Sequence, residues 1–141
     1  MEIRNLQKND YYLNYLDLLS QLTLVNKHNI LFNKFKYFVE ELKENHIIRV
    51  IELNNKIVAS GTLYIENKII HEFGKVGHIE DVVIDISIRG KKLGKKIVQN
   101  LIDLSEKNGC YKVILNCNKN NIKFYEKCGL IQKEYEMVKY F

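Results

Sequence analysis

The sequence lacks tryptophan and proline altogether and has only three cysteines and seven glycines among its 141 residues. Long apolar runs are also missing, since no stretch approaches the roughly 20 residues that a membrane-spanning helix needs. The opening residues, Met1–Lys8, have no apolar signal core. We therefore expect a cytoplasmic protein that does not use a membrane. The absence of proline is a compositional bias without functional meaning.

The cysteines exclude two further classes of protein. Cys110, Cys117 and Cys128 are odd in number and lack C-x-x-C spacing, which argues against a disulfide framework and against a zinc site. We expect free thiols in a reducing compartment and no metal. No repeat, linker or low-complexity tract divides the chain, so residues 1–141 are expected to form a single domain.

The charge balance is moderately basic. The net charge is +5 and the pI is about 9.0, but the lysines are spread along the chain. A diffuse excess of lysine is typical of a solvated surface, so no nucleic-acid partner is expected. The one dense cluster lies between Arg89 and Lys96, where five of eight residues are cationic.

Hydrophobic periodicity predicts a short strand around Ile3, two helices, a meander of strands, and then strand–helix–strand–helix–strand. Asp10 is expected to cap a first helix that carries Leu13, Leu16, Leu19 and Leu22. A second helix carries apolar residues from Phe32 to Leu42. The later elements are strands at 47–53, 57–66 and 78–84, with Asn54-Asn55 as a turn, a helix from Leu93 to Leu104, a strand at 113–115, a short helix ended by Gly129, and a last strand at 131–141. This order predicts an α/β (α+β) fold with a mixed sheet flanked by helices.

The stretch from Val82 to Lys96 organises the site. It reads as a buried strand, a turn that holds the cationic cluster, and the start of an amphipathic helix. Cations are unfavourable at a helix N-terminus, because free N–H groups and the helix dipole already make that end positive. A ligand that carries phosphate groups would explain their presence there.

Two motifs resemble those of one superfamily. Arg89-Gly90-Lys91-Lys92-Leu93-Gly94 resembles the [RQ]-x-x-G-x-[GA] turn with which GNAT N-acetyltransferases hold the pyrophosphate of acetyl-CoA, although Lys92 replaces the inner glycine. About 30 residues later, the segment from Asn121 to Leu130 resembles the superfamily's N-x-x-[FY]-Y-x-x-x-G-[FL] motif. The resemblance implies a GNAT-type, mostly antiparallel central sheet with a cofactor cleft after the central strand.

Three further segments resemble glucosamine-6-phosphate N-acetyltransferases in particular. They are Lys68-Ile69-Ile70-His71, Gly77-His78-Ile79-Glu80-Asp81-Val82 and Gly109-Cys110-Tyr111-Lys112. With the two motifs, the resemblance covers Asn67 to Met137, about half of the chain. Before residue 60 it extends to the layout more than to motifs.

The resemblance implies a role for each matched residue. The cofactor site would comprise Val82, Val83, Ile84, Arg89, Gly90, Lys91, Lys92, Leu93, Gly94, Asn121, Tyr125, Glu126 and Lys127, with the Val82 N–H facing the thioester carbonyl. The sugar-phosphate site would comprise Thr23, Lys68, Ile69, Ile70, His71, Glu80, Asp81, Val82, Tyr111, Lys112, Asn116 and Lys139. The catalytic residues would be Glu80, Asp81 and Tyr125.

Physical chemistry supports these roles independently. An amine attacks a thioester only when it is neutral, so a carboxylate such as Glu80 or Asp81 is useful as a proton acceptor. In a regular strand these two side chains point to opposite faces, so one would face the site and the other would support it. The Tyr125 hydroxyl would donate a hydrogen bond to the departing thiolate.

Two positions depart from the family. Asn116 stands where the family usually has a carboxylate, and an amide cannot take a proton, which makes Glu80 the stronger candidate for the base. The family also has an arginine in its last strand that reaches the substrate across a dimer interface. Here Tyr140 occupies that position, with Lys139 beside it as a candidate substitute in a homodimer.

The sequence therefore predicts acetyl transfer from acetyl-CoA to the 2-amino group of D-glucosamine 6-phosphate, without a metal. The product would serve UDP-N-acetylglucosamine synthesis. Two alternatives stay open: a GNAT enzyme for another small amine or a peptide N-terminus, and a non-catalytic module that binds acyl-CoA or RNA.

Overall fold

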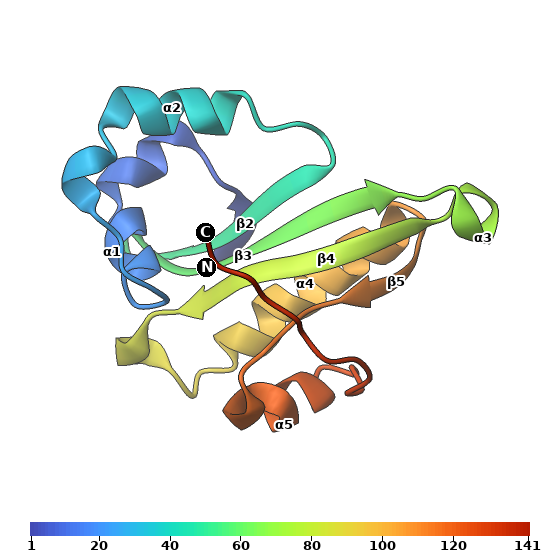
Figure 1. The fold of residues 1–141 in the computed structure, drawn as a ribbon. Helices are drawn as coiled ribbons and strands as arrows, with labels where there is room; N and C mark the ends of the chain where they lie inside the picture. Colours follow the sequence, from blue (N-terminus) through green and yellow to red (C-terminus); the bar gives the residue numbers. More distant parts are fainter.

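The computed structural model describes residues 1–141 as a five-stranded mixed sheet with helices on both faces (Figure 1). The strands run in sequence order across the sheet: β1 (Glu2–Asn5), β2 (His46–Leu53), β3 (Lys56–Asn67), β4 (Lys75–Ile84) and β5 (Cys110–Ile114). All neighbours are antiparallel except β4 and β5, which are parallel. The predicted fold class is confirmed.

The β2–β3 hairpin turns at the two asparagines that the sequence singled out. Asn54 and Asn55 have φ values of 52° and 57°, the left-handed conformation that a two-residue turn between twisted strands requires. Asparagine tolerates this conformation better than most residues. The turn fixes the register in which Leu53 pairs with Lys56, and so determines which side chains of β3 face each layer.

The helices divide between the two faces of the sheet. On one face lie η1 (Lys8–Tyr12), α1 (Tyr15–Leu19), η2 (Lys27–Asn29) and α2 (Phe32–Glu40). On the other lies the long helix α4 (Leu93–Lys107), preceded by η3 (Ile86–Ile88). The remaining short helices are α3 (Ile70–Phe73) between β3 and β4, and η4 (Lys119–Asn121) with α5 (Ile122–Glu126) after β5.

Each layer buries an apolar surface against the sheet. The α4 side chains Ile97, Val98 and Leu101 are fully buried, at the helical spacing that the sequence predicts. Burying each side chain stabilises the fold by roughly 1.5 to 3 kcal/mol. On the opposite face, Leu18 of α1 and Phe35 of α2 pack over the first half of the sheet.

The predicted cap at Asp10 is wrong, and so is the continuous helix that follows it. Asp10 lies inside η1 and is 1% exposed; its carboxylate accepts hydrogen bonds from the Arg4 guanidinium at 2.7 and 2.9 Å. Asn14 then adopts a φ of 62°, which breaks the helix and starts α1 in a new direction. Asp10 instead occupies the third position of η1, where its carboxylate also accepts a hydrogen bond from the Gln7 backbone N–H at 2.7 Å, so it supports the start of η1 while it pairs with Arg4 of β1.

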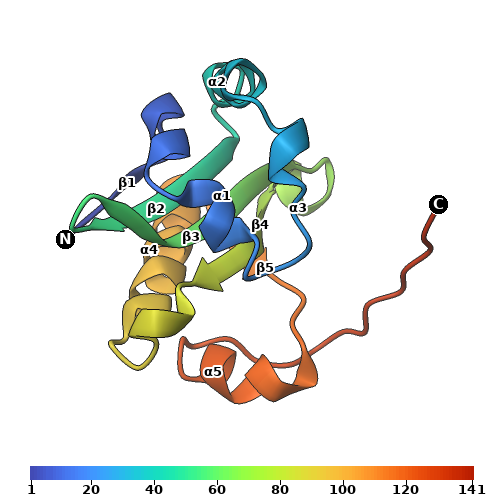
Figure 2. The same cartoon turned by 90° about the vertical axis from the view of Figure 1, so that its left-hand side faces the viewer.

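The predicted last strand is also wrong for the single chain. Residues after Glu126 form no regular secondary structure, and Figure 2 shows the segment leading away from the sheet. Its apolar side chains are largely exposed: Ile131, Tyr135, Met137, Val138, Tyr140 and Phe141. A strand needs a neighbour to satisfy its backbone groups, and this segment has none within its own chain. None of the helices is both long and apolar enough to cross a membrane.

Candidate active site

The centre of the site is a bulge in β4. Thr62 of β3 pairs with Glu80, and Ser60 pairs with Val83, so Asp81 and Val82 together face Gly61. Asp81 has a φ of 52°, which an aspartate adopts only at some cost. Such bulges redirect side chains and interrupt the regular ladder. At Gly61, an added Cβ would lie 2.8 Å from Leu101 Cδ1, so a larger residue here would force the buried Leu101 side chain to shift.

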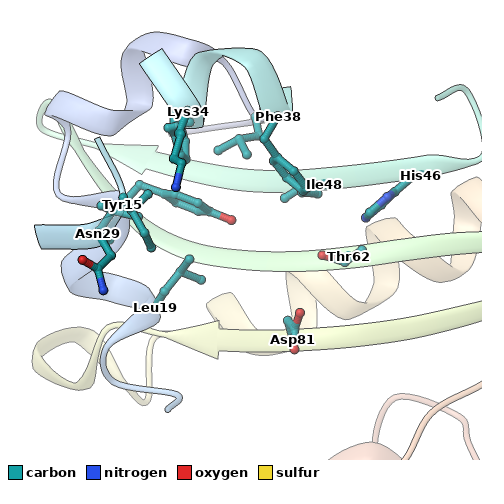
Figure 3. Close-up of a pocket in the computed structure, with 13 residues that line it drawn as sticks. Tyr15, Leu19, Asn29, Lys34, Phe38, His46, Ile48, Thr62 and Asp81 are labelled. Atoms are coloured by element: carbon teal, nitrogen blue, oxygen red, sulfur yellow. The ribbon is translucent and has the colours of Figure 1, made fainter. Parts of the chain in front are cut away.

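The bulge corrects the expectation that Glu80 and Asp81 point to opposite faces. Glu80 lies directly opposite Thr62, and directly opposed side chains share a face. Asp81 and Thr62 both line a cavity of about 530 Å³ beneath α1 and α2. Figure 3 shows Asp81 and Thr62 on neighbouring strands with their side chains turned toward this cavity. Both carboxylates therefore lie on the α1–α2 side of the sheet.

The cavity wall carries a buried tyrosine. The hydroxyl of Tyr15 lies 3.2 Å from Ser60 Oγ, and Figure 3 places its ring above β3. Burial raises the pKa of Tyr15 above its ordinary value, and the charge of Asp81 adds to this effect. At neutral pH the hydroxyl is therefore protonated and available as a donor. The remaining wall is mainly apolar.

Beyond the bulge, β4 loses its neighbour on one side. β5 pairs only with the segment from Lys75 to His78, and the register ends at Ile114. The backbone of Val82–Ile84 therefore has no strand partner on the β5 side. Unpaired strand groups of this kind can hydrogen-bond an extended ligand. This is where the sequence expected the arm of the cofactor to lie.

The basic turn follows directly at the end of β4. Asp85, which is 2% exposed, accepts hydrogen bonds from the backbone and hydroxyl of Ser87 and forms an ion pair with Lys56 at 2.6 Å. Lys56 and the Ser87 donors hold the pKa of Asp85 well below its usual range. This ionised carboxylate fixes η3, and η3 positions the turn from Arg89 to Lys92 before α4 begins.

The turn fits a ligand with phosphate groups. Gly90 has a φ of 89° and open space around it, and the α4 N-cap is Lys92, whose side chain makes no capping bond. The first N–H groups of α4 therefore remain available, as they are in phosphate-binding helices. The cations of the turn make no ion pair with an acidic residue: Arg89, Lys91, Lys92, Lys95 and Lys96. The free backbone N–H groups of α4 and these unpaired cationic side chains both suit the pyrophosphate of acetyl-CoA.

Lys92 occupies the position at which the superfamily motif has glycine. Its φ of 61° lies in the left-handed region that glycine adopts freely. The glycine preference in the motif is therefore conformational, and Lys92 meets the same requirement at a cost of roughly 1 to 2 kcal/mol. Gly94 serves packing instead, because a Cβ there would lie 3.1 Å from the Phe124 ring.

α5 brings Tyr125 toward the same region. The Tyr125 ring packs edge-on against Phe124 at 4.9 Å between centroids, and Phe124 contacts the first turn of α4. Burial raises the pKa of the Tyr125 phenol, so this group remains a proton donor at neutral pH. Asn121 forms the N-cap of α5, while Glu126 and Lys127 close the helix. The two motifs are therefore adjacent in space.

The segment expected to bind sugar phosphate lies at the far end of β3 and β4. Lys68 pairs with Glu66 at 3.0 Å, and the His71 ring packs on the Tyr111 ring at 4.3 Å between centroids, with a tilt of 39°. Lys112 Nζ lies 5.7 Å from the centre of the Tyr111 ring. Ile69 and Ile70 are exposed. The fold thus brings His71 together with Tyr111 and Lys112.

Three expected residues lie outside these clusters. Thr23 is exposed in the loop after α1, which is tied to η3 by the hydrogen bond from Ile86 N to Gln21 Oε1 at 2.8 Å. Asn116 is exposed just after β5. Lys139 lies in the exposed C-terminal segment, with Nζ 5.6 Å from the Phe141 ring. No three acidic, histidine or cysteine side chains are grouped as metal ligands would be.

Sequence reasoning missed two features of the site. Nothing in the spacing of the first helix indicates that the hydroxyl of Tyr15 reaches Ser60. Glu66 and His78 also went unassigned, although they form a hydrogen bond at 2.9 Å beside Lys68. The alternation of polar residues at Tyr64, Glu66 and Lys68 was the available signal, because alternate residues share one face of a strand.

Comparison with known proteins bears on this arrangement directly. Residues 2–130 match the family model described as the Acetyltransferase (GNAT) family. The chain belongs to the GNAT acetyltransferase family. It is 44% identical to the glucosamine 6-phosphate N-acetyltransferase of Arabidopsis thaliana, over 99% of this chain and 96% of that protein. The enzyme of that name from Candida albicans is 39% identical, over 96% of this chain and 92% of its own length.

The GNAT fold is equally clear in three dimensions. The crystal structure of the Arabidopsis thaliana enzyme superimposes with a TM-score of 0.95 and covers 99% of this chain and 97% of that one. The resemblance predicted from residues 67–137 therefore extends over the whole chain. GNAT enzymes use acetyl-CoA, the ligand for which the N-terminus of α4 has fitting donors.

Proposed function

We propose that the protein transfers the acetyl group of acetyl-CoA to the 2-amino group of D-glucosamine 6-phosphate. The observation that carries the proposal is the full-length similarity to several enzymes of that name, combined with a β4 bulge that holds Glu80 and Asp81 on one face. The product is N-acetyl-D-glucosamine 6-phosphate, a precursor for UDP-N-acetylglucosamine. The free cysteines are consistent with a cytoplasmic location.

The cofactor is held by residues from three elements. The backbone of Val82–Ile84 binds the pantetheine arm, and the turn from Arg89 to Gly94 binds the pyrophosphate. Asn121, Glu126 and Lys127 complete the site from α5. The absence of internal ion pairs in the turn supports this assignment, because free cations are available to neutralise the added phosphate charges.

The reaction needs three functions from the protein. Glu80 accepts the proton of the amine, directly or through a water molecule, and Asp81 supports it from the adjacent position in the bulge. The Val82 N–H donates to the thioester carbonyl oxygen, where negative charge develops, a contact worth roughly 2.7 to 4 kcal/mol in other enzymes. The Tyr125 hydroxyl donates a hydrogen bond to the departing sulfur, for which its raised pKa keeps the proton in place.

The sugar phosphate is bound along β4 and β5. Lys68 and Lys112 provide positive charge for the phosphate, while His71 and Tyr111 form a wall of packed rings. Asn116 hydrogen-bonds the amine or a ring hydroxyl but takes no proton. Thr23 contacts the substrate from the loop after α1.

A homodimer completes this site. The apolar side chains of the segment from Ile131 to Phe141 are exposed in a single chain, and they would be buried if the segment packed against a second copy. In such a dimer, Lys139 would add positive charge to the partner's phosphate site. Sedimentation of the intact protein and of a variant ending at Leu130 tests this. A dimer that becomes monomeric on truncation supports the proposal, whereas an intact protein that is monomeric at micromolar concentration contradicts it.

The substrate is tested by measuring release of the CoA thiol. The wild-type protein should acetylate glucosamine 6-phosphate at least a hundredfold more efficiently, in kcat/KM, than glucosamine, because the phosphate contacts contribute binding energy. Spermidine and a peptide with a free N-terminus serve as competing amines. Equal rates with and without the phosphate, or a preference for another amine, would refute the substrate assignment.

A further inference from the structure

Two charged or titratable side chains beside Lys68, Glu66 and His78, have no role in the proposed reaction, although they form a cluster with Lys68 on the α1–α2 face of the sheet. The carboxylate oxygen Glu66 Oε1 lies 2.9 Å from His78 Nε2 and 3.0 Å from Lys68 Nζ. All three side chains are between about a quarter and two-fifths exposed. The cluster is therefore reachable by a ligand, yet it is internally hydrogen-bonded, with one carboxylate joining two nitrogen donors.

The sheet register places this cluster beside the proposed catalytic carboxylate. Thr62 pairs with Glu80, and Tyr64 pairs with His78, so these four side chains share one face with Glu66. His78 and Glu80 are two residues apart on β4, which corresponds to about 7 Å along the strand. In glucosamine 6-phosphate, the amine and the phosphate lie at opposite ends of the molecule. With Lys68 as a ligand of the phosphate, an amine at Glu80 puts the phosphate toward the cluster.

Each member of the cluster is held from a different side. The His78 ring packs on Tyr64 at 6.3 Å between centroids, and Tyr64 packs in turn on His46 at 6.0 Å. The Lys68 backbone N–H bonds to the Gly74 carbonyl at 2.8 Å, which fixes the base of its side chain. His78, and then Lys68, lower the pKa of Glu66, so its carboxylate is ionised at neutral pH.

Lys68 keeps free donors in this arrangement. An ammonium group has three N–H donors, and Glu66 occupies one of them. A lysine side chain otherwise samples many rotamers, and ordering it on binding costs free energy. We propose that Glu66 is a positioning residue for the sugar phosphate: anchored by His78, it holds the Lys68 ammonium at the distance from Glu80 that the phosphate requires. The inference rests on the proposed function and on Lys68 as a phosphate ligand.

The negative charge of Glu66 has a second, opposing effect on the binding of a phosphate. Glu66 is negatively charged and would repel a phosphate if it did nothing else. Positioning predicts weaker substrate binding when the charge is removed, whereas repulsion predicts tighter binding. The sign of the change therefore separates the two.

The experiment compares steady-state kinetics of Glu66→Gln, Lys68→Met and the double variant with wild type. For Glu66→Gln, KM for glucosamine 6-phosphate should rise about three- to tenfold, with kcat, KM for acetyl-CoA and the rate with unphosphorylated glucosamine unchanged. Adding Glu66→Gln to Lys68→Met should have no further effect, because the two residues act through one contact. Glu66→Asp, which keeps the charge but retracts it, should be intermediate. Glu40→Gln, at the exposed Lys8–Glu40 pair, is the matched control.

An unchanged or lower KM for glucosamine 6-phosphate in Glu66→Gln overturns the inference. A rise in KM on Glu66→Gln that is as large in the Lys68→Met protein as in wild type overturns it too. If Lys68→Met itself leaves KM unchanged, Lys68 does not bind the phosphate and the inference fails as well. These outcomes are distinct from failure of the proposed function, which the wild-type protein alone would reveal through a lack of preference for the phosphorylated sugar.

Discussion

Glu80 lies directly opposite Thr62, and the bulge that follows places Asp81 on the same side of the sheet. This relationship assigns unequal roles to two adjacent carboxylates. Glu80 occupies a regular pairing position, whereas Asp81 has a left-handed backbone held by the surrounding strands. Strained conformations of this kind concentrate at functional sites.

Replacing Glu80 should therefore affect catalysis more than replacing Asp81. Glu80→Gln is expected to lower kcat about a hundred- to ten-thousandfold, because the amine loses its proton acceptor. KM for acetyl-CoA should not change. The measurement is thiol release at saturating substrate, with Asp81→Asn as the comparison and Glu106→Gln, an exposed residue of α4, as the control. A larger loss in Asp81→Asn would reverse the assignment.

Tyr125→Phe should separate turnover from affinity. Loss of the hydroxyl removes the donor to the departing sulfur, so kcat should fall about a hundredfold while the Kd for acetyl-CoA changes less than twofold. Because folding raises the pKa of Tyr125, the phenol stays protonated up to about pH 10, its ordinary pKa. Wild-type kcat should therefore not fall through this group between pH 7 and pH 9. A matching loss of kcat and affinity would contradict the role.

Replacing Lys92 should affect the stability of the fold and the binding of acetyl-CoA in opposite directions. Lys92→Gly relieves the left-handed backbone, so the free energy of unfolding should stay the same or rise by up to about 1 kcal/mol. KM for acetyl-CoA should nevertheless rise several-fold, because one cation of the pyrophosphate site is lost. Lys92→Asn tolerates the same backbone without the charge, and should raise KM equally. An unchanged KM in both variants would show that Lys92 is only a turn residue.

The sequence predicted those features that depend on local patterns. The hairpin at Asn54-Asn55 and the core face of α4 needed only spacing and residue type, and the family followed from two motifs that resemble those of GNAT enzymes. The bulge at Asp81 could not be foreseen, because it depends on how β3 and β4 pair. Asp10 is not an N-cap, because from the third position of η1 its carboxylate binds Arg4 of β1 and the Gln7 backbone N–H, which the spacing of the leucines does not reveal. The C-terminal segment was misread because strand propensity cannot supply a missing neighbour.

Acid stability should depend on Asp85. Folding lowers the pKa of this carboxyl, so its ionised form stabilises the fold fully above about pH 4, the pKa in the unfolded chain. That contribution is lost as the pH falls further toward the lower folded-state pKa. Asp85→Asn should therefore lower the free energy of unfolding by about 1 to 3 kcal/mol at pH 7 and by less near pH 3. Urea unfolding at both pH values measures this.

The control for that experiment is Asp17→Asn, at an aspartate whose side chain is half exposed. It should change the stability by less than about 1 kcal/mol at either pH, since exposed ion pairs contribute little. A loss in Asp85→Asn that is equally large at pH 3 would mean that packing, and not charge, is what Asp85 provides.

A crystal structure of the protein with CoA and glucosamine 6-phosphate would locate both ligands directly. We expect the pyrophosphate to lie on the first N–H groups of α4, beside Arg89 to Gly94. We also expect the sugar nitrogen to lie within hydrogen-bonding reach of Glu80, directly or through one water molecule. A sugar phosphate bound away from the β4 bulge, or cofactor phosphates bound away from α4, would contradict the proposed site.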